Sequence, residues 1–213
     1  MDQAKFKEIY DNNLWLSAES KSGTGSTLAA TKEIRQSLAD IFSNYEIRNL
    51  LDYGCGDFNW MNELAIMLDK YVGLEIVDEL VVANREKYKE DIWVTFAHST
   101  PEMFNIYLAQ HFDAILVRDV LVHFSDQHVT EFLNKIAQSK IKYMFATNFL
   151  GKGHNNDIQT GWWRDMCLMN PPFNLNNPIE TIVCYSEPFV INEAQGTRYD
   201  KTLSMWEIKT MFK

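Results

Sequence analysis

One short stretch, residues 50–58, constrains the fold more than any other, and it reads LLDYGCGDF. Its apolar start predicts a buried strand. Gly54 and Gly56 predict a tight turn, because glycine adopts backbone conformations that a Cβ atom forbids. A helical pattern follows, and the first N–H groups of a helix have no partner within the helix. The stretch therefore predicts a strand, a turn and a helix, with a ligand lying against the turn.

The acidic residues around this turn narrow the choice of ligand. A dinucleotide fingerprint, G-x-G-x-x-G, needs a third glycine where this chain has Asn59. The carboxylates of Asp52 and Asp57 would repel a phosphate, but they suit a ligand with an ammonium group, while the N–H groups of the turn could hold a carboxylate. S-adenosylmethionine carries both groups, so we expect it as the cofactor.

The stretch from Asp52 to Gly56 resembles the first motif, acid-x-G-x-G, of the class I S-adenosylmethionine-dependent methyltransferases. Small bacterial members of this family are similar in three further places, which here read LWLSAESKSGTGS (14–26), RDVLVH (118–123) and PPFNL (171–175). The resemblance covers most of the chain. It implies an α/β fold with a doubly wound, seven-stranded Rossmann-like sheet, mostly parallel with an antiparallel C-terminal strand.

Hydrophobic periodicity independently predicts alternating strands and helices, hence a parallel sheet with helices on both faces. The predicted helices are 3–12, 34–45 (capped by Ser26 or Thr27), 61–68, 78–90 and 129–137, and the predicted strands are 50–53, 71–76, 92–97, 111–117, 141–147, 179–185 and 201–208. At 213 residues we expect one domain. Its parts are N-terminal helices and a lid (1–46), a cofactor core (47–148), an acceptor-side loop (149–178) and closing strands (179–213).

Ligands of such sheets bind beyond the carboxyl ends of the strands. Glu75, which ends the second strand, is placed to accept hydrogen bonds from a ribose diol; a solvated carboxylate is the alternative, and Asp78 is a second candidate. In the resembled family an acid after the third strand often contacts adenine, whereas this chain has His98 and Ser99 there, so the His98 ring or a backbone group would substitute. The predicted cofactor-binding residues are Asp52, Tyr53, Gly54, Cys55, Gly56, Asp57, Glu75, Ile76, His98, Ser99 and Arg118.

Three candidate catalytic residues follow the fourth strand: Arg118, Asp119 and His123. If this turn is helical, Asp119 and His123 share a face, and the carboxylate can orient the imidazole and raise its basicity. His123 would then act as the general base, and Arg118 could hold an anionic acceptor. The alternative is a helix cap followed by a half-buried histidine.

Two further segments are expected to contact the methyl acceptor. Residues 17–26 could be a disordered linker, but the neighbouring Trp15 favours an ordered lid.

Residues 149–178 form a long loop of little periodicity, and such loops are usually functional or disordered; two tryptophans favour order. The tetrapeptide NPPF (170–173) matches a motif of amino-methyltransferases that follows strand four, but here it follows strand five and predicts a turn or part of the acceptor cover. The predicted acceptor contacts are Trp15, Ser22, Gly23, Asn148, His154, Trp162 and Arg164.

The charge of the chain bears on its partners. The net charge of −9 leaves no basic footprint for a nucleic acid, and no apolar run is long enough to span a membrane. Three cysteines without paired spacing predict neither disulfides nor a metal site. We therefore expect a cytoplasmic monomer or homodimer that acts on a small molecule without nucleic acid or membrane.

These expectations combine into a transferase that moves a methyl group to an oxygen or nitrogen of a small molecule. Such an acceptor could be a sugar, a phosphorylated metabolite or a precursor of a capsule or other cell-surface polysaccharide. The alternatives are a nicotinamide-dependent oxidoreductase, which Asp52 and Asn59 disfavour, and a non-catalytic protein that binds S-adenosylmethionine.

Overall fold

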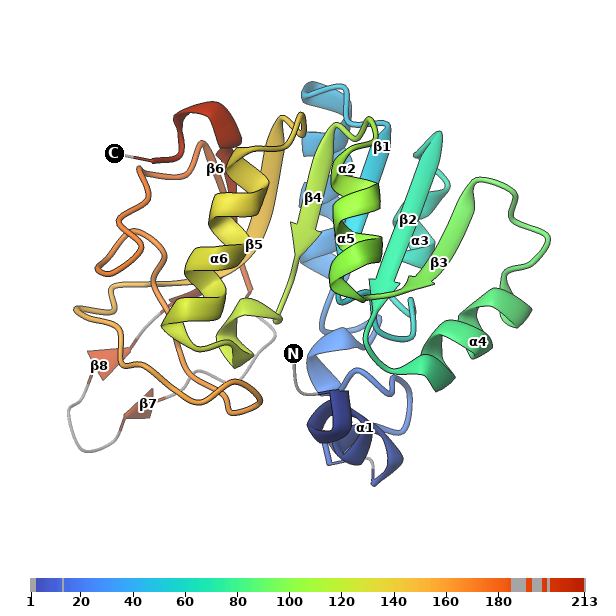
Figure 1. Cartoon of the computed structure of the whole chain (residues 1–213), viewed down its shortest axis with the longest axis horizontal. Coiled ribbons are helices and arrows are strands. Elements are labelled where there is room, and N and C mark those ends of the chain that lie inside the picture. The colour runs from blue at the N-terminus through green and yellow to red at the C-terminus, as the bar shows by residue number, and fades with distance from the viewer. Residues whose placement is uncertain (1–2, 13, 185–190, 193–196, 199, 213) are drawn as a thin grey trace.

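A computed structural model describes residues 3–12, 14–184, 191–192, 197–198 and 200–212 (Figure 1). Seven strands form one sheet in the order β3-β2-β1-β4-β5-β9-β6. The strands are β1 (Asn49–Tyr53), β2 (Lys70–Glu75), β3 (Val94–His98), β4 (Ala114–Val117), β5 (Tyr143–Leu150), β6 (Glu180–Val183) and β9 (Asp200–Glu207). The first five run parallel, and β9 lies antiparallel to both β5 and β6. The predicted fold class is confirmed.

Helices cover both faces of this sheet (Figure 1). On one face, α2 (Lys32–Asn44) and α3 (Asn62–Ala65) pack in the same buried cluster as Leu50 of β1. On the other, α5 (Pro101–Leu108) and α6 (Asp126–Ala137) pack with Leu51, the next residue of that strand. Successive side chains of a strand point to opposite faces, so β1 anchors both halves of the core. The helix α4 (Asp78–Lys87) follows β2.

The structure departs from the predicted elements in several places. Helix α5 was not predicted. Its Phe104 is buried and Met103, Tyr107 and Leu108 pack partly buried against the same core cluster, so it has a short apolar face that the sequence analysis missed. Helix α3 is shorter than the predicted 61–68. The N-cap of α2 is Thr31 rather than Ser26 or Thr27, because Thr27 Oγ1 accepts from Ala30 N (3.2 Å) in a turn that precedes the helix. A two-stranded sheet, β7 (Ile191–Asn192) with β8 (Thr197–Arg198), was also missed, and Tyr185 of a predicted strand lies outside the described residues.

The N-terminal helix α1 (Gln3–Asp11) lies at the edge of the sheet where β1 and β2 end (Figure 1). Its Phe6 packs with Val77 and Leu80, at the start of α4. Gln3 Nε2 donates to Asp78 Oδ2 (3.2 Å), and Lys7 pairs with Glu79. The carboxyl edge of the sheet is therefore covered by the beginning of the chain. Among the described residues, no helix has the length and apolarity needed to cross a membrane.

Candidate active site

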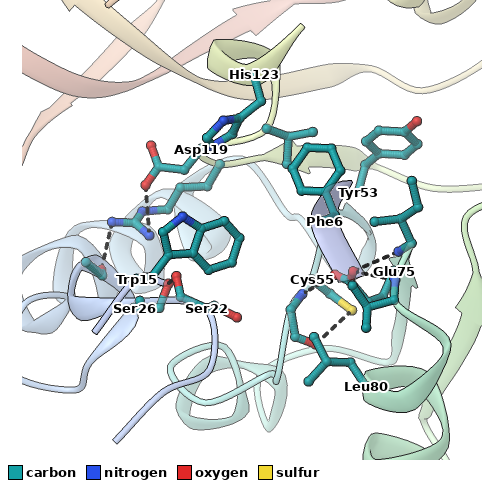
Figure 2. A pocket seen from close by; sticks show the side chains of 18 of the residues that line it. Phe6, Trp15, Ser22, Ser26, Tyr53, Cys55, Glu75, Leu80, Asp119 and His123 are labelled. Carbon is teal, nitrogen blue, oxygen red and sulfur yellow. Dashed lines mark hydrogen bonds and ion pairs between the residues drawn. The ribbon is translucent and has the colours of Figure 1, made fainter. Parts of the chain in front are cut away.

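A cavity of about 360 Å³ lies at this edge, between the glycine turn, α1 and the turn after β4. Figure 2 shows Glu75, Leu80 and Cys55 toward one end, Asp119 and Trp15 toward the other, and Phe6 near Tyr53. The predicted residues that line the cavity are Trp15, Ser22, Gly23, Asp52, Tyr53, Gly54, Cys55, Gly56, Glu75, Ile76, Ser99, Arg118, Asp119 and His123. The volume is within the range of small-ligand sites.

The glycine turn has the strained backbone that the sequence predicted. Gly54 has φ 84° and Gly56 has φ 58°; a Cβ atom would lie 2.4 Å from Val120 Cγ2 at the first position and 1.9 Å from Ser22 Oγ at the second. The N–H groups of the turn, however, are used by the protein itself. Gly54 N donates to Leu74 O (2.8 Å) and Gly56 N to Glu75 Oε2 (2.9 Å). The expectation that these donors would hold a ligand carboxylate is therefore corrected.

Asp52 is a buried carboxylate at the floor of the cavity. The Tyr71 hydroxyl, from β2, donates to its Oδ2 over 2.6 Å. Burial raises the pKa of Asp52 to about 7, although the bond from Tyr71 and the charge of Arg118 act in the opposite direction. Near neutral pH, Asp52 is therefore poised to become an anion when a cation arrives.

Glu75 ends β2 beside the turn, and its carboxylate accepts three backbone N–H groups. Oε1 accepts from Ile76 N (2.8 Å) and Val77 N (2.9 Å), and Oε2 accepts from Gly56 N. Burial nevertheless raises its pKa. A carboxylate offers about four acceptor sites, so Oε2 keeps one for a hydroxyl group.

Asp57 does not line the cavity, and its contact with the cofactor stays a prediction. Its carboxylate accepts from Ser20 Oγ (3.0 Å), Lys21 N (2.7 Å) and Ser22 Oγ (3.2 Å). Its own N–H donates to Ser22 Oγ over 3.1 Å. Asp57 therefore fastens residues 14–26, which we term the strap, to the glycine turn, and the strap forms one wall of the cavity.

Arg118, Asp119 and Lys201 form a charged group at the other end of the cavity. Asp119 Oδ2 lies 3.3 Å from Arg118 Nη1 and 3.0 Å from Lys201 Nζ. Although burial opposes it, the positive charges of Lys201 and Arg118 hold the pKa of Asp119 well below its usual range. Arg118 also donates to Gly25 O of the strap (3.0 Å) and lies over the Trp60 ring.

The expected pairing of Asp119 with the His123 ring is also corrected. Asp119 has φ 57°, so the chain is not helical there, and residues 121–123 form a short 3₁₀ turn. His123 Nδ1 instead lies 2.9 Å from Trp162 O. A carbonyl only accepts, so Nδ1 carries the proton and the neutral ring keeps its lone pair on Nε2. Burial lowers the pKa of His123, which favours this neutral form.

His98 does not line this cavity but the hollow beside it, and its contact with adenine stays a prediction. Its Nε2 lies 3.0 Å from Ile76 O and its Nδ1 3.2 Å from Asp78 Oδ1. The ring thus supports the turn after β2 and faces a neighbouring hollow of about 280 Å³. Ser99 borders both spaces.

Four predicted acceptor contacts lie outside the described lining of the cavity. Asn148 is buried, with Oδ1 accepting from Leu168 N (2.8 Å), and His154 is exposed. Trp162 is 68% exposed and contributes its carbonyl to His123. Arg164 is buried, where its guanidinium contacts Asp126 (2.6 Å), Asn156 O (2.6 Å) and Phe124 O (2.9 Å). These residues build the loop that holds the His123 turn.

The same loop contains the NPPF tetrapeptide, which forms a turn and contributes no residue to the described lining of the cavity. Several lining residues were missed by the sequence analysis, among them Phe6, Tyr10, Trp60, Trp163 and Lys201. The first two belong to a helix with a weak apolar pattern, and Lys201 reaches the site through the pairing of β9 with β5. No local motif marks them.

The donors and acceptors of the cavity fit S-adenosylmethionine. Asp52 offers a carboxylate for an ammonium, Glu75 one acceptor site for a ribose hydroxyl, and Arg118 a cation for a carboxylate. Ile76, Val77 and Leu80 provide an apolar wall for a purine. The absence of side chains at Gly54 and Gly56 lets Val120 and Ser22 pack directly against the turn.

Comparisons with known proteins agree with this fold. Residues 50–139 match the family model described as "Methyltransferase domain". No curated protein sequence matches the chain significantly.

Among solved structures, the N-methyltransferase NodS from Bradyrhizobium japonicum WM9, in complex with S-adenosyl-L-homocysteine, superposes with a TM-score of 0.62 at 14% identity, covering 95% of this chain and 98% of that one. Magnesium protoporphyrin IX methyltransferase from Synechocystis PCC 6803, with bound S-adenosylmethionine, gives 0.55 at 12% identity over 96% and 97%. The methyltransferase domain of a bacterial Hen1 gives 0.55 at 10% identity over 84% and 99%.

Proposed function

We propose that this chain is an S-adenosylmethionine-dependent methyltransferase of class I, because residues 50–139 match a methyltransferase-domain model, and that it methylates an oxygen or a nitrogen of a small molecule in the cytoplasm. The acceptor class is a sugar, a phosphorylated metabolite or a precursor of a cell-surface polysaccharide. The net charge of −9 argues against a nucleic-acid acceptor.

The cofactor would lie along the glycine turn. Asp52 would face its ammonium group, Arg118 its carboxylate, and Glu75 Oε2 a ribose hydroxyl. Ile76 and Ser99 would border the adenine ring. S-adenosylmethionine supplies an electrophilic methyl group on a sulfonium. The protein's part is to hold the acceptor in line with that group in a site shielded from water.

One observation carries the catalytic proposal: the Trp162 carbonyl fixes the tautomer of His123, so a basic Nε2 belongs to a ring that lines the cavity. The ring packs edge-on against Phe6, with centroids 5.8 Å apart, and lies 6.3 Å from Trp15. His123 would remove the proton from an acceptor hydroxyl or ammonium. The cations of Arg118 and Lys201, partly balanced by Asp119, would favour an acceptor with an anionic group.

The test of this base is His123→Ala, with transfer of labelled methyl groups into a metabolite extract as the assay. We expect turnover to fall by about 10²-fold or more, the usual contribution of a general base, with little change in cofactor affinity. The matched control is His128→Ala, because His128 contacts Thr160 (2.6 Å) and lies on the neighbouring hollow. Equal turnover in the wild type and His123→Ala would make His123 a structural residue.

The pH profile gives a second readout. Burial lowers the pKa of His123, so with the cofactor saturating, the wild-type kcat/KM for the acceptor should fall only below the ordinary histidine range and stay flat above it. His123→Ala should lose that acidic limb. Absence of any methyl consumption by the wild type, despite cofactor binding by calorimetry, would favour the non-catalytic alternative.

A further inference from the structure

A tyrosine outside the cavity holds the carboxylate at its floor. Tyr71 lies on β2 and is fully buried, yet its hydroxyl donates to Asp52 Oδ2 over 2.6 Å. Asp52 is itself only 4% exposed. The bond therefore joins two polar groups inside the core, where a hydrogen bond to a charged acceptor is strong.

The residues around Tyr71 are closely packed. Gly73, the register partner of Asp52 on β2, could not carry a side chain, because a Cβ atom would lie 2.6 Å from Cys55 Sγ and 2.9 Å from Phe96 Cδ1. Tyr71 and Gly73 point to the same face of β2. The tyrosine ring packs against Phe58, with centroids 4.6 Å apart, which fixes the position of its hydroxyl.

Charged groups near Asp52 act on its ionisation in opposite directions, and Tyr71 adds a hydrogen-bond donor that carries no charge. Glu75 on β2 disfavours its ionised form, whereas Arg118 after β4 favours it. Cys55, in the turn, is buried with its pKa well above the usual thiol value and so adds no charge. Tyr71 stays protonated, because burial raises its pKa well above the usual phenol range. It is thus a permanent donor to Asp52.

We propose that Tyr71 is a positioning residue for the cofactor: its hydroxyl orients Asp52 and stabilises the carboxylate that receives the ammonium group. The inference rests on the proposed placement of that ammonium group at Asp52. Replacing Tyr71 should therefore weaken the binding only of ligands that carry the amino-acid end of the cofactor.

The experiment is calorimetric titration of wild type and Tyr71→Phe with S-adenosylhomocysteine and with 5′-methylthioadenosine, which has the nucleoside but neither ammonium nor carboxylate. If loss of the hydroxyl moves the pKa of Asp52 up by one unit from about 7, S-adenosylhomocysteine should bind about ninefold more weakly at pH 6 and less than about twofold more weakly at pH 8. The titration of the ligand's own amine cancels in this ratio. Binding of 5′-methylthioadenosine should be unchanged.

The matched control is Tyr45→Phe, which removes a hydroxyl that donates to Glu180 (2.8 Å) far from the described lining of the cavity; it should bind both ligands as the wild type does. A pH-independent ratio near one, or equal weakening of both ligands by Tyr71→Phe, would overturn the proposal. Failure of the wild type to bind S-adenosylhomocysteine would instead remove the cofactor placement, and the Tyr71 proposal with it.

Discussion

Gly56 shows how a single residue of the site can bring distant segments of the chain together. It is held at φ 58°, its N–H bonds to Glu75, and the place of its missing Cβ atom is taken by Ser22 of the strap. The glycine thereby lets two distant segments approach the same point. Asp57, the next residue, meets the strap through its carboxylate. Sequence reasoning predicted the backbone role of the glycine, because it is local, but not the partners of the acid, which lie 35 to 37 positions earlier.

Replacing Gly56 with alanine should therefore damage both stability and binding. A left-handed alanine costs about 1–2 kcal/mol, and the new methyl group would displace Ser22, so we expect a loss of about 2 kcal/mol or more and at least tenfold weaker cofactor binding. Chemical denaturation and calorimetry measure the two effects. Gly153→Ala is the control, since nothing lies within 4 Å of the position of its Cβ atom. Equal behaviour of the two variants would contradict the role of Gly56.

At the scale of elements, the strap is held by polar contacts more than by a buried apolar face. Leu14 and Leu16 are 51% and 82% exposed, while Glu19 accepts from Leu28 N (2.7 Å) and Asn59 Nδ2 (2.8 Å). Asn59 occupies the place of the third glycine in the dinucleotide motif, and its side chain also donates to Ser26 O (3.1 Å). Asn59, which argues against a nicotinamide cofactor, thus helps to hold the strap in place.

Removing the strap's main anchor should speed release of the cofactor. In Asp57→Ala, Lys21 N and two serine hydroxyls lose their acceptor, which should weaken closure of the strap by about 1–3 kcal/mol and raise the dissociation rate roughly 5- to 150-fold. Stopped-flow displacement of S-adenosylhomocysteine measures that rate. Asp40→Ala, on the exposed side of α2, should match the wild type. An unchanged rate in Asp57→Ala would show that the strap does not gate release.

Over the whole molecule, the alternating strands and helices were predictable because burial imposes a period on each element. The predicted Rossmann-like sheet is present, including the antiparallel return of β9 beside β5. The site was predicted where it consists of local motifs, namely the strap residues Trp15, Ser22 and Gly23 and the residues that follow β1 to β4. Phe6, Trp60 and Lys201 come from three separate parts of the chain, and their convergence depends on packing that no short segment encodes.

The buried Asp52 should also leave a mark on global stability. Its pKa rises from 3.8 to about 7 on folding, so the folded state binds more protons between these values. Its contribution to the free energy of unfolding is therefore fully present below pH 3.8 and is lost as the pH rises through 7. In denaturant titrations of the ligand-free protein, Asp52→Asn should lack this part of the pH dependence of the free energy of unfolding, which is on the order of 4 kcal/mol. Parallel curves for both proteins from pH 4 to 8 would contradict this.

The strap has a kinetic consequence. Ser22 to Ser26 form a wall of the cavity, Asp57 ties that wall to the turn, and Arg118 ties it to the end where His123 lies. A nucleoside ligand in this cavity would be enclosed by the same hydrogen bonds that must open for it to leave, so shielding and release would compete for one set of contacts. Weakening the serine contacts of the strap should therefore speed release at the cost of shielding.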